Sequence, residues 1–393
     1  NRSGLSVVDG SSWTSFSKNE ISKRIAGEDT TATAVHGCGV EMPKLTYISL
    51  FSGAGVGCHG FAMEGFTCVV SNELIQRRLD VQRFNNKCKY DSGYLAGDIT
   101  TPEIQNAILG QMELWRTKEQ VNDLDVLIAS PPCQGMSVAN HKKTKDEIKR
   151  NSLVTESIRQ IEQIRPRVFV FENVAAFLKT PCTDFDDVER PIGEAIEQHL
   201  SDKYSISAKV INFKDYGVPS SRTRTLVVGV RKDLSDQFSP LELFPQHSPE
   251  RTLREVIGHL PPLNEWGAIT DNDIYHSFRT YPEYMRRWIR DVPEGKSAFD
   301  NKDLDLKPHR IINGKIVVNQ QKNGDKYMRQ CWNKVAPCIH TRNDQLASQN
   351  TVHPSDDRVF SIRELMIMMS IPEEFKWTAI PFDELNKLTY KDK

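Results

Sequence analysis

The hydrophobic pattern from Leu45 to Val230 alternates short β-rich runs with longer amphipathic stretches. Strands are predicted at Thr46–Leu50, Thr67–Ser71, Asp125–Ala129, Val168–Phe171, Ser205–Asn212 and Thr225–Val230. Helices are predicted at Gly57–Met63, Arg77–Phe84, Pro102–Trp115, Leu153–Ile164 and Ile192–Leu200. This alternation predicts an α/β fold with a parallel sheet covered by helices on both faces. Because a short connection joins the last two strands, we expect them to pair antiparallel at one edge.

The flanking segments lack this alternation. Residues 1–44 are rich in Ser, Thr and Gly, and we expect an N-terminal extension with little core of its own. Residues 231–340 are dense in Pro, Asn, Asp and aromatics and are expected to form an inserted, irregular module. Regularity returns at Ser361–Ser370, a helix that Ser361 can cap together with Glu364. We therefore expect residues 341–393 to return to the α/β domain that residues 45–230 form.

Composition narrows the class of protein. The 393 residues are 38% hydrophobic and 26% charged, which is typical of a globular chain with room for two domains. The sequence has neither an apolar run long enough to span a bilayer nor the layout of a signal peptide, so we expect a soluble, non-secreted protein. Its eight cysteines never occur as C-x-x-C, which gives a metal site no support and suits a reducing compartment.

Charge is segregated along the chain. The net charge of −1 argues against a general nucleic-acid binder. However, residues 139–167 carry +4 and residues 279–343 carry +7, so the remainder carries −12. This distribution favours one basic face that meets a polyanion, with ordinary solvated surfaces as the alternative.

A glycine-rich loop, Phe51–Gly60, follows the first predicted strand. Glycines at a strand-to-helix turn let the backbone approach a ligand closely. Residues 55–60 match G-x-G-x-x-G, a motif of dinucleotide-binding folds, but this match starts five residues after the strand, which is late for such a turn. Residues 53–57 match G-x-G-x-G, which favours S-adenosylmethionine over a dinucleotide. Glu73 ends the second strand, where such folds bind ribose hydroxyls. Asp98 is placed either to reach an adenine amino group or to cap a helix.

The candidate chemistry lies at the carboxyl ends of the next two strands. Cys133 follows Pro131-Pro132 and heads a basic loop, an environment that favours a thiolate; a buried structural cysteine is the alternative. Glu172 ends the following strand and is expected to face the same crevice, or else to cap the next helix. Arg222 and Arg224 enter the edge strand, where alternation would put both on one face.

In chain order these motifs resemble those of the cytosine-5 DNA methyltransferases of bacterial restriction–modification systems. The shared motifs are Phe-x-Gly-x-Gly, an acidic residue, Gly-Asp, Pro-Pro-Cys-Gln, Glu-Asn-Val and Gly-Val-Pro-x-x-Arg-x-Arg. Residues 358–364 are similar to the family's Arg-x-Leu-Thr-x-Arg-Glu block. The resemblance runs from Leu45 to about Phe375. Ser220 and Met368-Met369-Ser370 depart from the family pattern.

The resemblance implies a Rossmann-like, S-adenosylmethionine-dependent methyltransferase fold: a mixed sheet with an inserted irregular target-recognition domain at residues 231–340. It implies methyl transfer to C5 of a flipped-out cytosine in a specific duplex DNA sequence, through a covalent bond between Cys133 and C6. Glu172 would contact the cytosine at N3 and its amino group. Arg222 and Arg224 would orient the base and nearby phosphates.

The same resemblance implies the cofactor site. Phe51 would stack on the adenine of S-adenosylmethionine, Glu73 would hold the ribose and Asp98 the adenine amino group. The remaining cofactor-binding residues would be Gly53, Gly55, Ile99 and Pro132. The basic loop after Cys133 would close on double-stranded DNA, and the enzyme would act in the bacterial cytoplasm, at the nucleoid.

One family motif has no counterpart here. The closing Gly-Asn-Ser-Val motif and its helix are absent from these residues. We expect a second polypeptide or a further segment to supply it, and apolar surface around Phe51 and Phe61 to be exposed without it. A tRNA cytosine-5 methyltransferase and a non-catalytic DNA-binding subunit remain alternatives. Candidate readers of the DNA sequence are Arg279, Arg286, Arg287, Arg310, Arg329 and Arg342.

Overall fold

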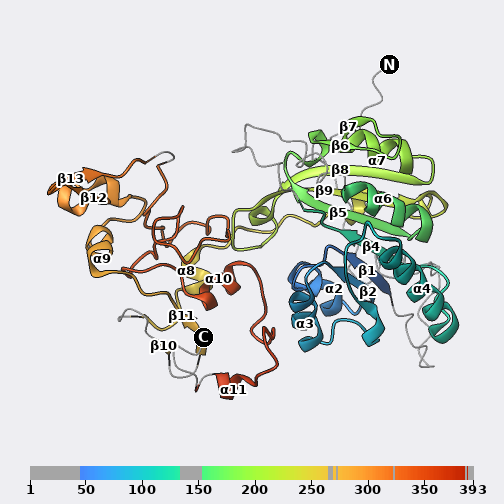
Figure 1. Cartoon of the computed structure of the whole chain (residues 1–393), viewed down its shortest axis with the longest axis horizontal. Coiled ribbons are helices and arrows are strands. Elements are labelled where there is room, and N and C mark those ends of the chain that lie inside the picture. The colour runs from blue at the N-terminus through green and yellow to red at the C-terminus, as the bar shows by residue number, and fades with distance from the viewer. Residues whose placement is uncertain are drawn as a thin grey trace. The chain divides into compact units, whose positions relative to one another are not determined.

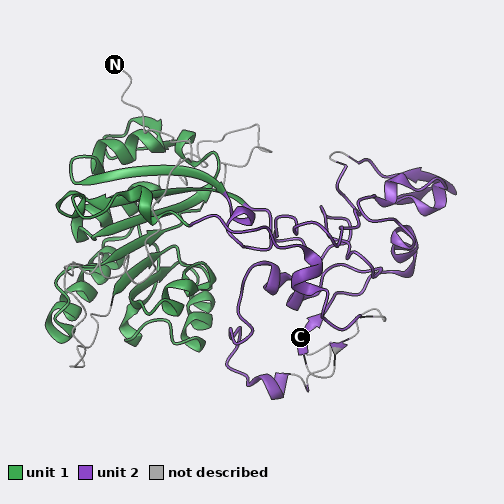
Figure 2. Cartoon of the chain, turned by 180° about the vertical axis from the view of Figure 1, so that it is seen from behind, with its two compact units in different colours: residues 1–211, 223–245 green, residues 212–222, 246–393 purple. Residues whose placement is uncertain are grey.

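The computed structural model describes residues 45–132, 153–263, 269–270, 273–321, 324–385 and 387. They divide into two compact units (Figure 2). Unit 1 contains the residues up to 211 together with residues 223–245, and unit 2 contains residues 212–222 and those from 246 onward. The expected extension at residues 1–44, the predicted nucleophile Cys133 and the basic loop that follows it lie outside the described residues.

Unit 1 is built on a seven-stranded sheet with the order β3-β2-β1-β4-β5-β9-β8 (Figure 1). The strands are β1 (Thr46–Leu50), β2 (Thr67–Glu73), β3 (Tyr94–Ala96), β4 (Val126–Ala129), β5 (Val168–Val174), β8 (Tyr204–Asn212) and β9 (Thr223–Arg231). The neighbouring strands β3, β2, β1, β4 and β5 run parallel to one another, whereas β9 runs antiparallel to β5. The sheet is therefore mixed, and β8 lies at its edge beside β9, as the short connection between them predicts.

Helices cover both faces of this sheet, as the alternating pattern predicts. They are α2 (His59–Met63), α3 (Gln76–Phe84), α4 (Pro102–Glu119), α6 (Leu153–Ile164) and α7 (Ile192–Leu200), and a 3-10 turn, η1 (Val56–Cys58), precedes α2. Along β1, Ile48 and Leu50 join the core beneath α4, α6 and α7, whereas Tyr47 joins the opposite core with Leu79 of α3. Successive strand residues thus enter opposite cores, which is why these strands read as nearly continuous apolar runs.

Unit 2 consists of short elements around two smaller cores. They are η4 (Phe213–Asp215), α8 (Leu253–Ile257), β10 (Ile269–Thr270), β11 (Asp273–Ser277), α9 (Glu283–Ile289), η7 (Ala298–Asp300), η8 (Leu304–Leu306), β12 (His309–Ile312), β13 (Lys315–Val318), α10 (Ile362–Met368) and α11 (Phe382–Leu385). Helix α10 begins at the predicted capping box, in which Ser361 and Glu364 each bond the other's backbone N–H. Among the described residues, no helix combines the length and apolar character that a membrane crossing requires.

The unit boundaries differ from those expected at residues 231 and 341. Leu234, Phe238 and Phe244 are buried in the core of unit 1, which extends that unit to residue 245. Residues beyond 341 cluster with unit 2, because Met368 of α10 packs in one core with Leu253 of α8. The roles of the two units in catalysis and target recognition stay predictions.

Candidate active site at the carboxyl ends of the strands

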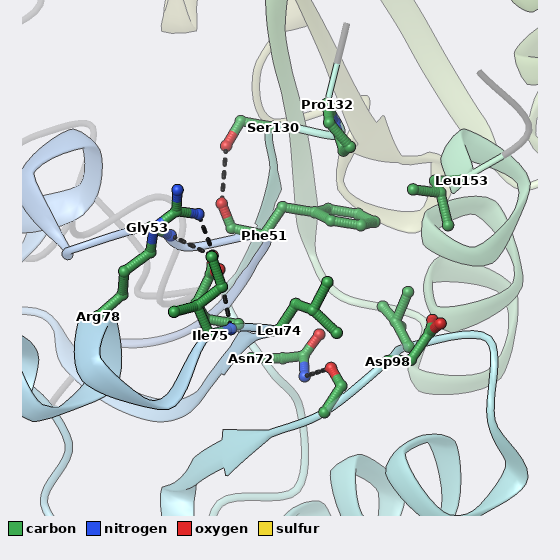
Figure 3. A pocket seen from close by; sticks show the side chains of 13 residues that line it. Phe51, Gly53, Asn72, Leu74, Ile75, Arg78, Asp98, Ser130, Pro132 and Leu153 are labelled. Atoms are coloured by element: carbon green, nitrogen blue, oxygen red, sulfur yellow. Dashed lines mark hydrogen bonds and ion pairs between the residues drawn. The ribbon is translucent and has the colours of Figure 1, made fainter. Parts of the chain in front are cut away.

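Unit 1 contains a cavity of about 490 Å³ where β1, β2 and β4 end (Figure 3). Its lining residues are Phe51, Gly53, Asn72, Glu73, Leu74, Ile75, Arg78, Gly97, Asp98, Ile99, Ser130, Pro132 and Leu153. Six of the seven predicted cofactor-binding residues are in this set, and only Gly55 is not. Open α/β sheets bind ligands at this edge, so the cavity lies where the sequence predicts the cofactor.

The glycine loop forms the floor of the cavity through an unusual run of backbone conformations. Phe51, Gly53 and Gly55 have φ of 54°, 56° and 86°, all in the left-handed region. For a bulky residue such as Phe51 this conformation is strained, and strain of this kind clusters at functional sites. It directs the Phe51 ring into the cavity, near Pro132 (Figure 3). An exposed aromatic face in a cavity is a stacking surface for a flat ring.

Glu73 fastens the glycine loop to the end of β2. Its buried carboxylate accepts a hydrogen bond from Gly53 N at 2.9 Å through Oε2. Oε1 accepts from Ile75 N at 3.2 Å and from Arg78 Nη1 at 2.9 Å. Because a carboxylate oxygen can accept two bonds, Oε2 keeps one acceptor position beyond its contact within the described residues. That position suits a ligand hydroxyl.

Asp98 does not cap α4, whose N-cap is Thr101, and its contact with an adenine amino group stays a prediction. Its Oδ1 accepts from Thr100 N and Oγ1, both at 2.9 Å, in the turn that leads into α4. The exposed carboxylate nevertheless lines the cavity beside buried Ile99. Asn72, which the sequence analysis missed, fixes this turn by donating to Leu95 O at 3.0 Å and Gly97 O at 3.2 Å. Asp98 is therefore held by its neighbours and still accessible to a ligand.

Gly55 packs against Gln82 of α3, and its contact with the cofactor stays a prediction. A Cβ at this position would lie 2.8 Å from Gln82 Cγ, so only glycine fits against that side chain. Gln82 is 1% exposed, and its Nε2 donates to Ser52 Oγ at 2.8 Å and to Gly53 O at 2.6 Å. Its Oε1 lies 2.5 Å from Ser71 Oγ. Nothing in the sequence of α3 distinguishes Gln82 from the exposed polar residues around it.

Gln82→Leu is expected to weaken binding of S-adenosylmethionine roughly tenfold, because it leaves buried loop groups without partners at about 1–3 kcal/mol each. Gln76→Leu is the matched control, since Gln76 lies exposed on the same helix and bonds only Asp80 among the described residues. Calorimetric titration of both variants measures the effect. Equal affinities would show that Gln82 does not position the loop.

The loop that leads to Cys133 is held against β5. Strands β4 and β5 are parallel neighbours with Ala129 opposite Phe171. Asn173 is buried, and its Nδ2 donates to Pro131 O at 2.8 Å while its Oδ1 accepts from Val174 N at 2.9 Å. The Asn of the Glu-Asn-Val motif therefore fixes the prolines that precede Cys133. Sequence reasoning gave a role in this motif to Glu172 only.

Glu172 lies within β5, which continues to Val174, and it does not cap a helix in the described structure. Its Oε1 pairs with Arg224 Nε at 2.9 Å. Both side chains are partly buried. The structure thus brings together Glu172 and Arg224, which the sequence analysis selected independently.

Arg222 is placed differently from the prediction. Strand β9 begins at Thr223, so Arg222 precedes it and belongs to unit 2. Its backbone N–H donates to Asn212 Oδ1 at 2.9 Å, and its Nη1 lies 3.7 Å from Cys338 Sγ. Because Arg222 precedes β9 and Arg224 lies within it, the expected placement of both side chains on one face stays a prediction.

The family is decided by a comparison with known proteins. The model of the C-5 cytosine-specific DNA methylases matches residues 45–382. The chain belongs to this family. It is a DNA (cytosine-5)-methyltransferase, and the resemblance carried by its motifs is confirmed.

Curated relatives agree with this assignment. The Type II methyltransferase M1.HgaI of Avibacterium volantium is 32% identical over 84% of this chain and 88% of its own length. The Type II methyltransferase M1.HphI of Haemophilus parahaemolyticus is 30% identical over 84% of this chain and 79% of its own length.

Solved structures show the same fold. One is described as a DNA modification methyltransferase encoded within a prophage of E. coli. It matches with a TM-score of 0.58 and 17% sequence identity, and the match covers 88% of this chain and 95% of that one. The S. pombe Dnmt2 methyltransferase gives a TM-score of 0.51 and 13% identity over 88% of this chain and 92% of that one. The predicted α/β methyltransferase fold is confirmed.

Proposed function

We propose that this enzyme transfers a methyl group from S-adenosylmethionine to C5 of a cytosine flipped out of duplex DNA, through a covalent Cys133–C6 intermediate. One observation carries the proposal. The cavity lined by Phe51, Glu73 and Asp98 adjoins the Pro131-Pro132 loop, which Asn173 ties to the strand of Glu172. A cavity that fits the cofactor, the prolines that precede Cys133 and the candidate acid Glu172 thus belong to one edge of the sheet.

The lining of the cavity fits S-adenosylmethionine. Its volume of about 490 Å³ is within the range of small-molecule pockets. The Phe51 ring offers a face to the adenine, Glu73 Oε2 an acceptor to the ribose, and Asp98 a carboxylate to the adenine amino group. When bound, S-adenosylmethionine supplies an electrophilic methyl group on its sulfonium sulfur. Gly53 and the buried Ile99 complete the lining.

The protein's task is to make cytosine C5 nucleophilic. The Cys133 thiolate adds its electron pair to C6, the C5–C6 double-bond electrons form a double bond between C5 and C4, and the C4–N3 double-bond electrons move to N3. Glu172 delivers a proton to N3, so that no full negative charge builds up on the base. The electron pair at C5 then takes the methyl group, whose bond to the sulfonium sulfur breaks with its electrons kept by the sulfur. A base removes the C5 proton, the electrons of that C–H bond form the C5–C6 double bond and expel the Cys133 thiolate, and N3 returns its proton to Glu172.

Arg224 is a positioning residue in this scheme. Its Nε holds Glu172 Oε1 at 2.9 Å, and its Nη1 donates to Thr223 O at 2.7 Å. The guanidinium therefore fixes one carboxyl oxygen and leaves the other for the base. Because none of these atoms can reach a cytosine inside a stacked duplex, the target must leave the helix at a cost of about a few kcal/mol.

A second polypeptide or a further segment that supplies the closing motif belongs to the same proposal. Helix α2 has no buried residue, and its Met63 is 68% exposed, as is Leu74 at 67%. Phe61 itself is half-buried, because its ring stacks on Tyr47 with centroids 4.8 Å apart and packs edge-on against Phe66. The apolar surface that supports a covering segment is therefore on Met63 and Leu74.

Methylation of random-sequence duplex DNA and of tRNA with labelled S-adenosylmethionine tests the proposal, with bisulfite sequencing to find the modified base. We expect label on cytosine C5 of duplex DNA and none on tRNA. Glu172→Gln should lower the rate by roughly 10²–10⁴-fold. Glu189→Gln, an exposed carboxylate of the β6–β7 hairpin (Pro181–Thr183 and Glu189–Pro191), is the control. Label on tRNA alone would overturn the proposal.

A further inference from the structure

The β12–β13 hairpin of unit 2 has a well-defined two-residue turn. His309 pairs with Val318 at its base and Ile312 with Lys315 at its tip. Asn313 and Gly314 have φ of 50° and 73°, the left-handed conformations that a type I′ turn requires. The pairing register therefore fixes which side chains share a face.

The tip of this hairpin exposes apolar side chains on both faces. Ile311 and Ile316 lie opposite each other on one face and are 72% and 42% exposed. Ile312 and Val317 lie on the other face and are 48% and 41% exposed. Neither face of the tip is thus covered by the described residues. A two-stranded hairpin is only marginally stable by itself in water. Exposure of these apolar side chains to water therefore has a free-energy cost unless a partner covers them.

The base of the hairpin is anchored in unit 2. Asn319 N donates to Pro308 O at 2.8 Å, which closes the strand pair at its open end. The His309 ring lies against Trp288 of α9 with centroids 5.5 Å apart, and Val318 packs on the same core. Figure 2 shows the hairpin at the periphery of unit 2. A fixed base and an uncovered tip are what a recognition element needs.

The charge of the hairpin is wholly positive. Residues 306–324 contain no Asp or Glu but include Lys307, Arg310 and Lys315. Arg310 is paired with Val317 in the register, so Arg310 and Lys315 share a face with Ile312. Both cations are exposed and have no carboxylate partner among the described residues. The occupant of this surface must therefore be anionic.

We propose that the β12–β13 hairpin enters the major groove of the substrate duplex and reads part of its sequence. The proposal rests on the proposed function, because it takes duplex DNA as the substrate. The major groove is about 12 Å wide and admits a two-stranded ribbon, and its walls contact both faces at once. Arg310 then pairs with a guanine edge, and the Ile and Val side chains contact thymine methyl groups.

A flat protein surface fits this hairpin less well. It would cover one face and leave the other apolar face in water. It would also have to be acidic to meet Arg310 and Lys315. A groove between two phosphate backbones satisfies both conditions without a further assumption.

Other arginines proposed as readers from the sequence are already engaged. Arg329 is 4% exposed and donates to Val292 O, Ile289 O and Asp357 among others. That expectation is wrong for Arg329, because its guanidinium is buried as a brace of unit 2. Arg279 pairs with Asp344 at 3.1 Å, and Arg287 pairs with Asp305 at 3.6 Å. Arg310 differs from Arg279 and Arg287 in having no carboxylate partner in the described chain, and from Arg329 in being exposed.

Bisulfite sequencing of a methylated random duplex library tests the proposal by giving the recognised motif of each variant. Arg310→Ala is expected to lower discrimination at one base pair by roughly 5- to 150-fold, the equivalent of about 1–3 kcal/mol. The double variant Ile311→Ser with Ile316→Ser should relax a thymine position. Binding of S-adenosylmethionine should be unchanged in both, which shows that unit 1 is intact.

Two matched controls should keep the wild-type motif. Ile362→Ser changes an aliphatic side chain of α10 that is 50% exposed. Arg290→Ala removes an exposed arginine that pairs with Glu283. Thermal unfolding of every variant shows whether the fold is retained.

Modified bases then test the groove directly. Wild-type enzyme should lose discrimination on duplexes with 7-deazaguanine at the Arg310-dependent position, because the N7 acceptor is removed. Arg310→Ala should be insensitive to that change. Uracil in place of thymine removes the methyl group, so the wild type should lose discrimination at the thymine position. The double isoleucine variant should be insensitive to that change.

Three outcomes would overturn the inference. The first is hairpin variants that keep the wild-type motif and rate. The second is variants that keep the motif but lose a dimer in ultracentrifugation, which would assign the hairpin to protein docking. The third is that the wild-type enzyme methylates no duplex DNA. This result would overturn the proposed function as well, and it differs from the first two outcomes, in which the wild type is active.

Discussion

Cys133→Ser is expected to abolish methyl transfer to duplex DNA while leaving S-adenosylmethionine binding close to that of the wild type. Addition to cytosine C6 needs a thiolate, and a serine hydroxyl does not ionise near neutral pH. Loss of a nucleophile typically removes roughly 10³-fold or more of the rate. Cofactor binding should persist, because the residues from Phe51 to Pro132 that line the cavity are unchanged.

A trapping experiment separates loss of chemistry from loss of folding. Duplex DNA with 5-fluorocytosine at the target lacks the C5 proton that must leave, so the wild type should remain covalently bound to it. Cys133→Ser should form no such complex. Cys331→Ser is the control, since Cys331 is a half-buried cysteine of unit 2. Appreciable turnover by Cys133→Ser would remove Cys133 from the mechanism.

The sheet could be predicted because its strands carry strong apolar signals. Strand β1 and helices α6 and α7 have the predicted bounds, since both faces of this sheet are buried and the apolar runs end where burial ends. Strand β3 was missed, because its three residues, Tyr94–Ala96, are too short to show a period. It is defined by pairing with β2, which is a tertiary contact.

The β12–β13 hairpin could have been found. Asn313-Gly314 lies between Ile311-Ile312 and Lys315–Val318, and Asn-Gly between β-branched residues is the strongest short hairpin signal. The turn signal was missed because the many Pro, Asn and Asp residues around it led to the prediction that this region is irregular. A local turn signal therefore deserves weight even within a segment of low periodicity.

The candidate site could be predicted in part. Phe51 follows β1 and Glu73 is the last residue of β2, so the predicted topology brings both to one edge, whereas Asp98 follows the missed strand β3. Gln82 and Asn173 could not be predicted, because their roles depend on the conformation of loops that they bond. Such buried polar side chains are specified by geometry, and their residue type alone carries no signal of it.

The largest effect on stability is expected from the buried ion pair at the start of α10. Arg358 and Glu364 are 2% and 1% exposed. Arg358 Nη1 and Nη2 donate to the two carboxyl oxygens of Glu364, each at 2.8 Å. Glu364 Oε2 also accepts from Ser361 N at 2.7 Å. Glu364→Gln should lower the free energy of unfolding by about 1.5–3 kcal/mol, because it removes one of the two carboxylates that pair with the buried guanidinium and leaves only Asp356, at 2.8 Å.

Acid should remove the same interaction from the wild type. Burial by itself would raise the pKa of Glu364, but the hydrogen bonds and charge of Arg358 lower that pKa to about 2. Burial lowers the pKa of the neighbouring His353 to about 4. Both pKa values are below those of the unfolded chain, so both groups stabilise the fold at neutral pH. The stabilisation is lost as pH falls, first from about 6.5 to 4 through His353 and then from about 4.5 to 2 through Glu364.

Urea unfolding at pH 7 and pH 4 measures both effects. Glu364→Gln should be much less stable than the wild type at pH 7. The gap should begin to narrow at pH 4, because below about pH 4.5 the unfolded wild type takes up a proton at Glu364, which the variant cannot do. Glu283→Gln is the matched control: it removes an exposed carboxylate paired with Arg290, a contact worth about 1 kcal/mol at most. If Glu364→Gln were within that range of the wild type at pH 7, the buried pair would not be what stabilises unit 2.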